Sequence, residues 1–232
     1  MAEKTSIEVK LNDVRLSFFH GFEPQPNRNK DGEIERYSYN VALLIPKGHA
    51  YEAQIKKAMS DVKKAQWGDS PPRLGPDKLC LRDGEPADEE GVRLPLYDGY
   101  EGMLYLAANS PVSIETYEAI KKGTKKRPVS IIGPRKGADG KFKQLNEDDE
   151  FAPYSGCFCN VIVQIYAYKG DSQKNLPARI NASLEAVQFK RHGEAFGRKQ
   201  VDVDRAFDEE DVEDEAPSTG SKSGGGDEFD IG

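Results

Sequence analysis

The clearest indication of the fold is the segment SIEVKLNDVRLSFFH at residues 6–20. Apolar side chains alternate along its first half, at Ile7, Val9 and Leu11. After Asn12 and Asp13 the alternation resumes one residue out of phase, at Val14, Leu16 and Phe18. A strand whose two-residue period shifts in this way contains a β-bulge, which bends it sharply. Bent strands allow a small antiparallel sheet to close into a barrel.

The rest of the chain up to residue 199 adds more strands and one clear helix. Alternation predicts strands at 36–46, 102–108, 156–168 and 179–191, with a short strand at 128–132. The last long strand changes phase between Leu184 and Val187. Apolar residues three or four apart predict a helix at 49–67, and a turn of helix is expected near 114–121. A polar loop is expected at 21–35, and a long irregular insertion at 68–100.

This pattern favours a mainly β chain with one or two helices. Five main strands and long insertions fit an OB-fold-like five-stranded barrel. An open α+β sheet is the alternative that the pattern leaves.

The charge is unevenly distributed. The whole chain carries −7, and residues 200–232 hold twelve Asp or Glu against Arg205 and Lys222, a net −10. Residues 1–199 are therefore +3. We expect a domain at 1–199 and a disordered acidic tail at 200–232. The tail can mimic a polyanion and bind partner proteins, with an aid to solubility as the alternative. Its tip is the expected partner-binding segment: Asp227, Glu228, Phe229, Asp230 and Ile231.

Several functional classes find little support. No stretch has the roughly 20 apolar residues that a membrane span needs, and the N-terminus has no apolar signal region, so a cytosolic protein is expected. The three cysteines are expected to be reduced core residues, without zinc: Cys80, Cys157 and Cys159. The three histidines stand alone, and phosphate-loop, dinucleotide and metal-spacing motifs are lacking. We therefore expect no catalytic residues, no metal and no cofactor.

Positive charge is densest between residues 121 and 143. This stretch holds nine basic residues against Asp139: Lys121, Lys122, Lys125, Lys126, Arg127, Arg135, Lys136, Lys141 and Lys143. Four glycines are expected to make it mobile. Such a loop suits a phosphate backbone, because Lys and Arg release condensed counterions on binding. A solvated surface loop is the alternative.

The strand at 156–168 adds an aromatic face. Its odd-numbered residues are apolar and predict the core side. Its even-numbered residues mix aromatic rings with amides: Phe158, Asn160, Ile162, Gln164, Tyr166 and Tyr168. Aromatic rings beside polar groups on an exposed face can stack nucleobases, worth roughly 1–3 kcal/mol per base. Four more tyrosines are stacking candidates: Tyr37, Tyr39, Tyr105 and Tyr154. Alternatively, these tyrosines pack under the insertions with their hydroxyls hydrogen-bonded.

Short stretches across nearly the whole body resemble one known family. They are VKLNDVRLSF at 9–18, LIPK at 44–47, LRDG at 81–84, YEG at 100–102, LAANS at 106–110, YSGC at 154–157, the strand at 160–168 and LEAVQF at 184–189. They resemble the single-stranded DNA-binding proteins of tailed bacteriophages. The resemblance implies an OB barrel with insertions that binds single strands during phage replication or recombination, in the cytoplasm of an infected bacterium. It also implies that the acidic tail recruits replication proteins. Those tails often end on an aromatic residue, whereas here Asp230, Ile231 and Gly232 follow Phe229.

Together these features predict a non-enzymatic protein that binds single-stranded DNA without reading sequence. Additional phosphate contacts are expected from Arg15, Arg82 and Lys174. The tail is expected to compete with DNA for the same groove. Duplex DNA and self-association along the strand are further candidate interactions, and no membrane is expected. Two alternatives stay open: a protein-interaction module with incidental DNA affinity, and a magnesium-dependent nuclease that uses Asp83, Asp88, Glu89 and Glu90.

Overall fold

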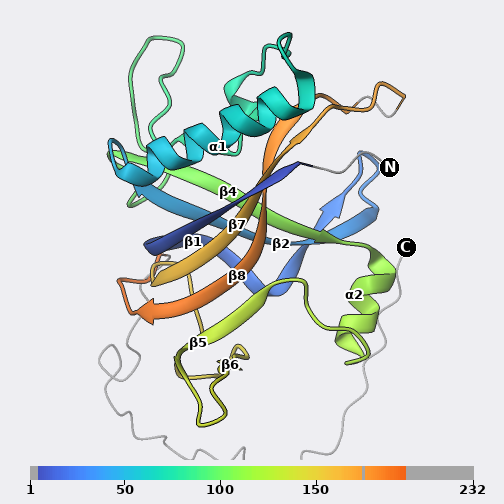
Figure 1. The fold of residues 1–232 in the computed structure, drawn as a ribbon, viewed down its shortest axis with the longest axis vertical. Helices are drawn as coiled ribbons and strands as arrows, with labels where there is room; N and C mark the ends of the chain where they lie inside the picture. Colours follow the sequence, from blue (N-terminus) through green and yellow to red (C-terminus); the bar gives the residue numbers. More distant parts are fainter. Residues whose placement is uncertain (1–4, 174–175, 197–232) are drawn as a thin grey trace, which may run out of the picture. The chain divides into compact units, whose positions relative to one another are not determined.

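The computed structural model describes residues 5–173 and 176–196 (Figure 1). Eight strands and two α-helices occupy these ranges, with one 3-10 turn at Pro76–Lys78. The strands are β1 (Ser6–Arg28), β2 (Ile34–Pro46), β3 (Leu81–Asp83), β4 (Met103–Val112), β5 (Ser130–Lys136), β6 (Phe142–Gln144), β7 (Phe158–Tyr168) and β8 (Arg179–Arg191). The helices are α1 (Ala50–Trp67) and α2 (Ile114–Lys121). No helix within the described ranges is long and apolar enough to cross a membrane.

Five of the strands close into a barrel. Their order is β4-β2-β1-β7-β8, and β8 returns to pair in parallel with β4 where Ala108 meets Ala182. Strand β3 adds to the free side of β4, and β5 and β6 extend the sheet beyond β8. The prediction of a mainly β, OB-fold-like five-stranded barrel is confirmed. The open α+β sheet is wrong, because the β4–β8 pairing removes the open edges of the five-stranded sheet.

Strand β1 bends twice and runs along two neighbours. Its pairing with β7 shifts between Leu11 and Val14, where Asp13 has φ 55°. Its pairing with β2 shifts again after Ser17, where Phe18 has φ 48°. The predicted bulge is therefore confirmed at Asp13. The polar loop predicted at 21–35 is wrong over residues 21–28, which continue β1. The strand tolerates the two prolines there because its pairing with β7 ends at Arg15, so residues 21–28 pair with β2 on one side only and form an edge strand.

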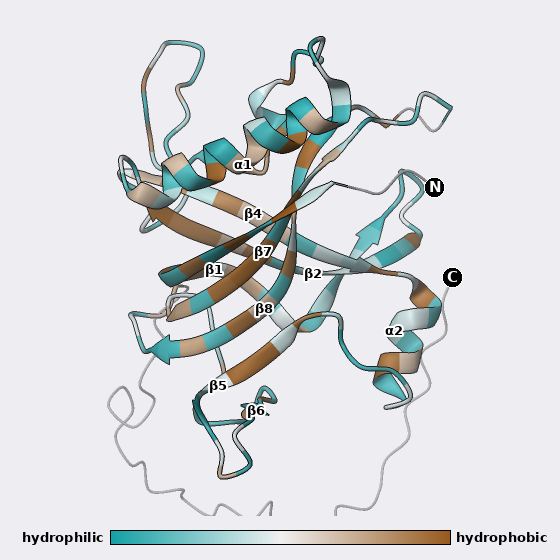
Figure 2. Cartoon of the chain, in the orientation of Figure 1, coloured by the Kyte–Doolittle hydropathy of each residue, from teal (hydrophilic) through white to brown (hydrophobic). Residues whose placement is uncertain are grey.

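The core fills the barrel and extends under α1. Alternate residues of β7 point inward and are almost fully buried, among them Cys159, Val161 and Ile165. The apolar stripe of α1 joins the same cluster through Ile55, Ala58, Met59 and Val62. Figure 2 shows this as brown bands along the barrel strands beneath the helix. The helix ends at Gly68, whose φ of 62° favours glycine.

The insertion between α1 and β4 forms an arm on the outside of the barrel. Its strand β3 pairs with β4, and the N–H of Ala107 donates to the carbonyl of Cys80. At its base Asp83 forms ion pairs with Lys47 and Arg93, both at 2.8 Å. Of this insertion, only residues 84–102, which follow β3, are called the arm below. Strands β4 and β5 end later than the strands predicted at 102–108 and 128–132. Helix α2 and strand β8 match their predicted ranges.

Candidate nucleic-acid interface

The second and third strands of the barrel, β2 and β4, present an outer face rich in amides and small side chains. Because Tyr39, Val41 and Leu43 of β2 point into the core, the residues between them face outward. Asn40 pairs there with Asn109, and Ala42 pairs with Ala107. In OB folds this face and the loops beside it bind oligonucleotides. We call the outer side of β2 and β4 the amide face.

Three arginines lie on strands that form or border the amide face: Arg36 on β2, Arg82 on β3 and Arg179 on β8. Burial raises the pKa of the Tyr166 hydroxyl, while a hydrogen bond with Asn181 and the charges of Arg36 and Arg179 act in the opposite direction. Both guanidinium groups are therefore close enough to Tyr166 to act on its charge. Arg82 donates to the carbonyls of Leu79 and Asp77 at 2.9 and 3.2 Å. This holds its side chain in place while other N–H groups of the fork remain for an anion.

A small cavity of about 60 Å³ lies between Arg82 and Arg179. Asn109 and Asn181 line it together with Arg82 and Arg179. These four side chains can donate hydrogen bonds to phosphate or nucleobase oxygens. Asp77 also lines the cavity, where its carboxylate is ion-paired with Lys78. Arg36 and Arg179 are absent from the residues expected from the sequence, since only the pairing of β2 and β8 with the strand β4 between them brings both to this surface.

Three of the predicted tyrosines are engaged within the protein. Tyr39 is wrong as a stacking residue: its side chain is 0% exposed in the core, and this burial raises its pKa. Tyr37 packs its ring against Tyr117, with centroids 3.9 Å apart. The hydroxyl of Tyr154 donates to the carbonyl of Gly193 at 2.9 Å and so anchors the C-terminal segment. Tyr105, Tyr166 and Tyr168 are partly exposed and stay predictions.

Two predicted basic contacts also serve internal packing. Arg15 donates to the carbonyls of Gly156 and Glu194, and its guanidinium lies 4.0 Å from the ring centroid of Phe196. Arg127 donates to the carbonyl of Leu145 at 2.9 Å, and burial lowers its pKa. Part of each guanidinium therefore holds a neighbouring segment, and the roles of Arg15 and Arg127 as phosphate contacts stay predictions.

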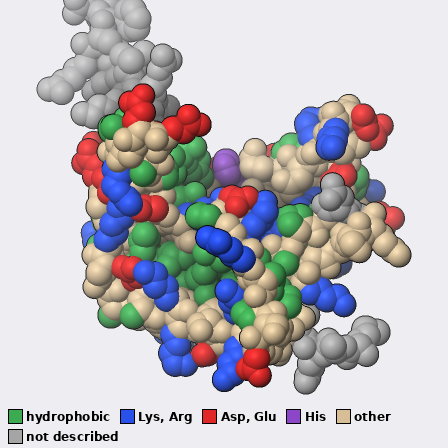
Figure 3. Space-filling view, turned by 90° about the horizontal axis from the view of Figure 1, so that it is seen from above, with side chains coloured by type: hydrophobic (Ala, Val, Ile, Leu, Met, Phe, Trp, Pro, Cys, Tyr) green, Lys and Arg blue, Asp and Glu red, His purple; other side chains and the backbone are tan. Residues whose placement is uncertain are grey.

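Four of the remaining basic residues form an exposed group at the end of α2 and just after it: Lys121, Lys122, Lys125 and Lys126. Arg135 and Lys136 are also exposed, at the end of β5. Beside the group of four lysines lies a cavity of about 600 Å³ that Lys125, Lys126, Ser130 and Asn146 help to line. No acidic side chain lines this cavity, which therefore suits an anion. We call this group the basic lobe. In the view of Figure 3, Lys and Arg side chains lie among hydrophobic ones around the middle of the face.

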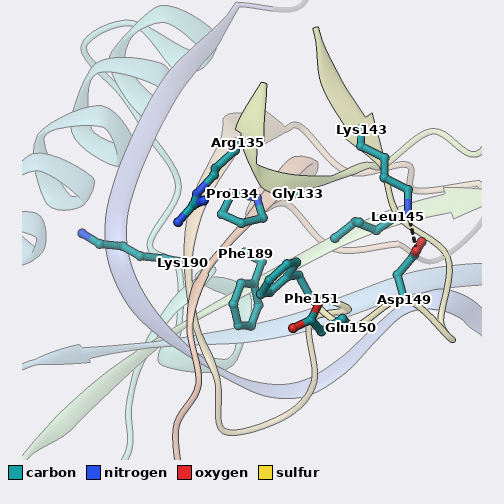
Figure 4. A pocket seen from close by; sticks show the side chains of 10 residues that line it. All are labelled: Gly133, Pro134, Arg135, Lys143, Leu145, Asp149, Glu150, Phe151, Phe189 and Lys190. Atoms are coloured by element: carbon teal, nitrogen blue, oxygen red, sulfur yellow. Dashed lines mark hydrogen bonds and ion pairs between the residues drawn. The ribbon is translucent and has the colours of Figure 1, made fainter. Parts of the chain in front are cut away.

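A second large cavity, of about 590 Å³, lies between β5 and β8 (Figure 4). The rings of Phe151 and Phe189 stand together on one wall, with centroids 5.6 Å apart. An ion pair between Lys143 and Asp149 occupies another wall. Because this cavity carries both signs of charge, it is less suited to a polyanion than the basic lobe.

Lys174 and the tail residues 200–232 lie outside the described ranges. Within those ranges no group of three or more His, Cys, Asp or Glu is placed to hold a metal ion. Two of the four acids proposed for a nuclease are held by separate internal contacts. Lys47 and Arg93 pair with Asp83, and Asp88 accepts the N–H groups of Glu90 and Val92.

Comparisons with known proteins point to one family. A family model described as the ssDNA-binding protein of Enterobacter phage Enc34 matches residues 7–217. The protein p50 of Acyrthosiphon pisum secondary endosymbiont phage 1 is 30% identical over 214 residues, which cover 88% of this chain and 94% of p50. The solved single-stranded DNA-binding protein of bacteriophage Enc34 in complex with ssDNA is 20% identical, with a TM-score of 0.55 over 82% of this chain and 89% of that one. Another structure of the Enc34 protein is 21% identical, with a TM-score of 0.54 over 87% and 90%.

Proposed function

Since this chain belongs to the family of the Enterobacter phage Enc34 ssDNA-binding protein, we propose that it binds single-stranded DNA without reading sequence and without catalysing a reaction. The observation that carries the proposal is the family match over residues 7–217. The closed barrel supports it, because its amide face is the surface that OB folds use for oligonucleotides.

The chemistry of the described surface suits a flexible single strand. Arg36, Arg82 and Arg179 lie on or beside the amide face and can donate hydrogen bonds to phosphates, and the basic lobe offers a second group of cations. Asn40 and Asn109 carry both a donor and an acceptor, so either can adapt to any of the four bases. Contacts to phosphates position the strand but do not specify its sequence.

The finer parts of the function rest on the family and on the composition of the tail. The protein acts in phage DNA replication, recombination or repair, in the cytoplasm of the infected bacterium. Its acidic tail competes with DNA for the cationic surface, because a net charge of −10 is attached to a domain of net +3. The tail tip at 227–231 recruits replication or recombination proteins. Further proposed partners are duplex DNA and other copies of the protein bound along the same strand.

The test is a fluorescence titration of the full-length protein with a thymine oligomer across a salt series. Trp67 and the tyrosines provide the signal, and a duplex of equal length is the control. We expect tight binding to the single strand that weakens linearly in the logarithm of salt concentration. A variant that ends at residue 199 should bind more tightly at low salt. Failure of both proteins to bind at low salt would contradict the function.

A further inference from the structure

Phe18 has a backbone conformation that is costly for its type of side chain. Its φ of 48° lies in the left-handed region, which bulky residues rarely adopt. Asp13, which shares this conformation, is an acceptable residue type there and is held by Arg191 at 2.9 Å. Phe18 has no comparable compensation in the core, because 46% of its side chain is exposed. Strain of this kind concentrates at functional sites.

The bulge of β1 places Phe18 beside the amide face. Phe18 and Phe19 lie between two paired positions, Ser17 with Ala42 and His20 with Asn40. Phe19 packs against the hydrophobic core and donates its N–H to the hydroxyl of Ser155. The extra residue of the bulge thus lets one ring contribute to the core while the other is presented to solvent next to β2.

Tyr97 of the arm completes a pair of exposed rings. Its ring meets that of Phe18 edge to face, with centroids 4.7 Å apart and planes at 72°. The Tyr97 side chain is 55% exposed. Behind it, Tyr100 lies 5.3 Å away and is 1% exposed, with its hydroxyl hydrogen-bonded to Ser17. A buried neighbour therefore fixes the exposed pair against the strand that carries Phe18.

Close backbone packing supports this part of the arm. Gly84 lies against the carbonyls of Tyr100 and Met103, where an added Cβ would approach to 2.9 and 2.8 Å. The N–H of Leu96 donates to the carbonyl of Gly84 at 2.9 Å. The arm thus returns to the barrel on both sides of Tyr97, which keeps that ring in position.

We propose that Phe18 and Tyr97 form a stacking platform for one unpaired nucleobase of single-stranded DNA. This inference rests on the proposed function and names the residues that hold a base. The strands cross the face in the order β8-β4-β2-β1. Strand β8, which carries Arg179, and strand β1, which carries Phe18, are three strand spacings apart across this face, roughly 14 Å. A strand bound with its phosphates toward the arginines has its bases toward the two rings.

The chemistry at the platform favours a base over a phosphate. The two rings are uncharged and offer a phosphate no positive charge, whereas a flat base gains contact with an aromatic ring whatever its sequence.

The decisive variant is Phe18→Gly, because glycine adopts the left-handed conformation without strain. We expect it to unfold at the same or a higher urea concentration than the wild type, yet to bind a thymine oligomer at least about fivefold more weakly. The slope of affinity against salt should not change, since every group that binds phosphate is still present. Tyr97→Ala should weaken binding similarly, while Phe18→Tyr and Tyr97→Phe should retain it.

The matched control is Leu94→Ala, because Leu94 is 64% exposed on the same arm but is not aromatic. Its affinity should equal that of the wild type. Photo-crosslinking with 5-iodouracil oligomers should attach the base to Phe18 or Tyr97. Wild-type binding with unchanged affinity in Phe18→Gly and Tyr97→Ala would overturn the platform and leave the proposed function intact. A wild type that does not bind overturns the function itself. Loss of self-association in both variants, with unchanged affinity for short oligomers, would assign the rings to a second copy of the chain instead.

Discussion

Replacing Arg15 by alanine separates an internal anchor from a phosphate contact. The side chain donates to Gly156 at 3.1 Å and to Glu194 at 2.8 Å, and it stacks on Phe196. Each charge-assisted hydrogen bond contributes about 1 kcal/mol at this partly exposed position, and the stacking contributes about 0.5–1 kcal/mol. We therefore expect Arg15→Ala to lower the free energy of unfolding by about 2–3 kcal/mol.

Two assays measure this decrease. In urea the midpoint should fall by about 1 M for a slope near 2 kcal/mol/M. In hydrogen exchange the amide of Phe196, which donates to the carbonyl of Ser155 at 2.9 Å, should lose its protection. Arg15→Lys is the matched control. Lysine keeps the positive charge for a phosphate, but a single ammonium cannot reproduce the planar fork that reaches two separate carbonyls. It should lose about half of the same stability.

A phosphate contact would give the opposite pattern. Arg15→Ala would then keep the urea midpoint of the wild type, and the slope of log affinity against log salt would fall by about 0.7. Arg15→Lys would keep both the midpoint and the slope. Observing that combination would refute the structural role assigned to Arg15.

Three further changes test the basic lobe, the core and the arm. Lys125→Ala with Lys126→Ala should reduce the salt slope for single-stranded DNA by about 0.7 for each phosphate that these lysines neutralise, and an unchanged slope would remove the lobe from the interface. Tyr39→Ala should cost about 3–5 kcal/mol of stability in urea unfolding because the ring is fully buried, whereas Tyr37→Ala should cost clearly less; equal costs would contradict the assigned burial. Burial opposes ionisation of Asp83, but its hydrogen bonds and ion pairs lower its pKa to about 2. Ionised Asp83 therefore stabilises the folded state fully above about pH 4, and this stabilisation is lost as the pH falls through about 2. Asp83→Asn should cost about 1 kcal/mol at pH 7, and this cost should shrink steadily as the pH falls from about 4 through 2, which pH-dependent urea unfolding would show.

Strands with strong alternation can be predicted from the sequence, whereas those with prolines and amides cannot. The alternation predicts 179–191 for β8 because its inward positions are apolar almost throughout. Residues 21–28 read as part of a loop because Pro24 and Pro26 are poor strand residues. They nevertheless pair with β2, since Gln25 opposes Ser38 and Pro26 opposes Tyr37. Pairing of this kind depends on the neighbouring strand and leaves no periodic signal in either segment.

The same limit explains the omission of Phe18 from the predicted site. Val14, Leu16 and Phe18 continue one alternating pattern, and Val14 and Leu16 are buried. The pattern therefore assigns Phe18 to the core. A second bulge after Ser17 breaks the alternation, but Phe19 follows immediately, so an apolar residue occupies both phases. The sequence alone does not show which of the two adjacent phenylalanines points inward. The orientation depends on the arm, which covers Ser17.

The tyrosines of β2 and β4 show why a binding face needs the register between strands. From the sequence, Tyr39 of β2 and Tyr105 of β4 are both expected on one exposed face. The register opposes Tyr39 to Ser110, and Leu44 to Tyr105. In a paired ladder, residues directly opposite each other share a face. Tyr39 therefore lies inside with Ser110, and Tyr105 lies outside with Leu44. A shift of one residue in this register would exchange the two roles. Which alternate residues of each strand face the core therefore cannot be assigned before the neighbouring strand is known.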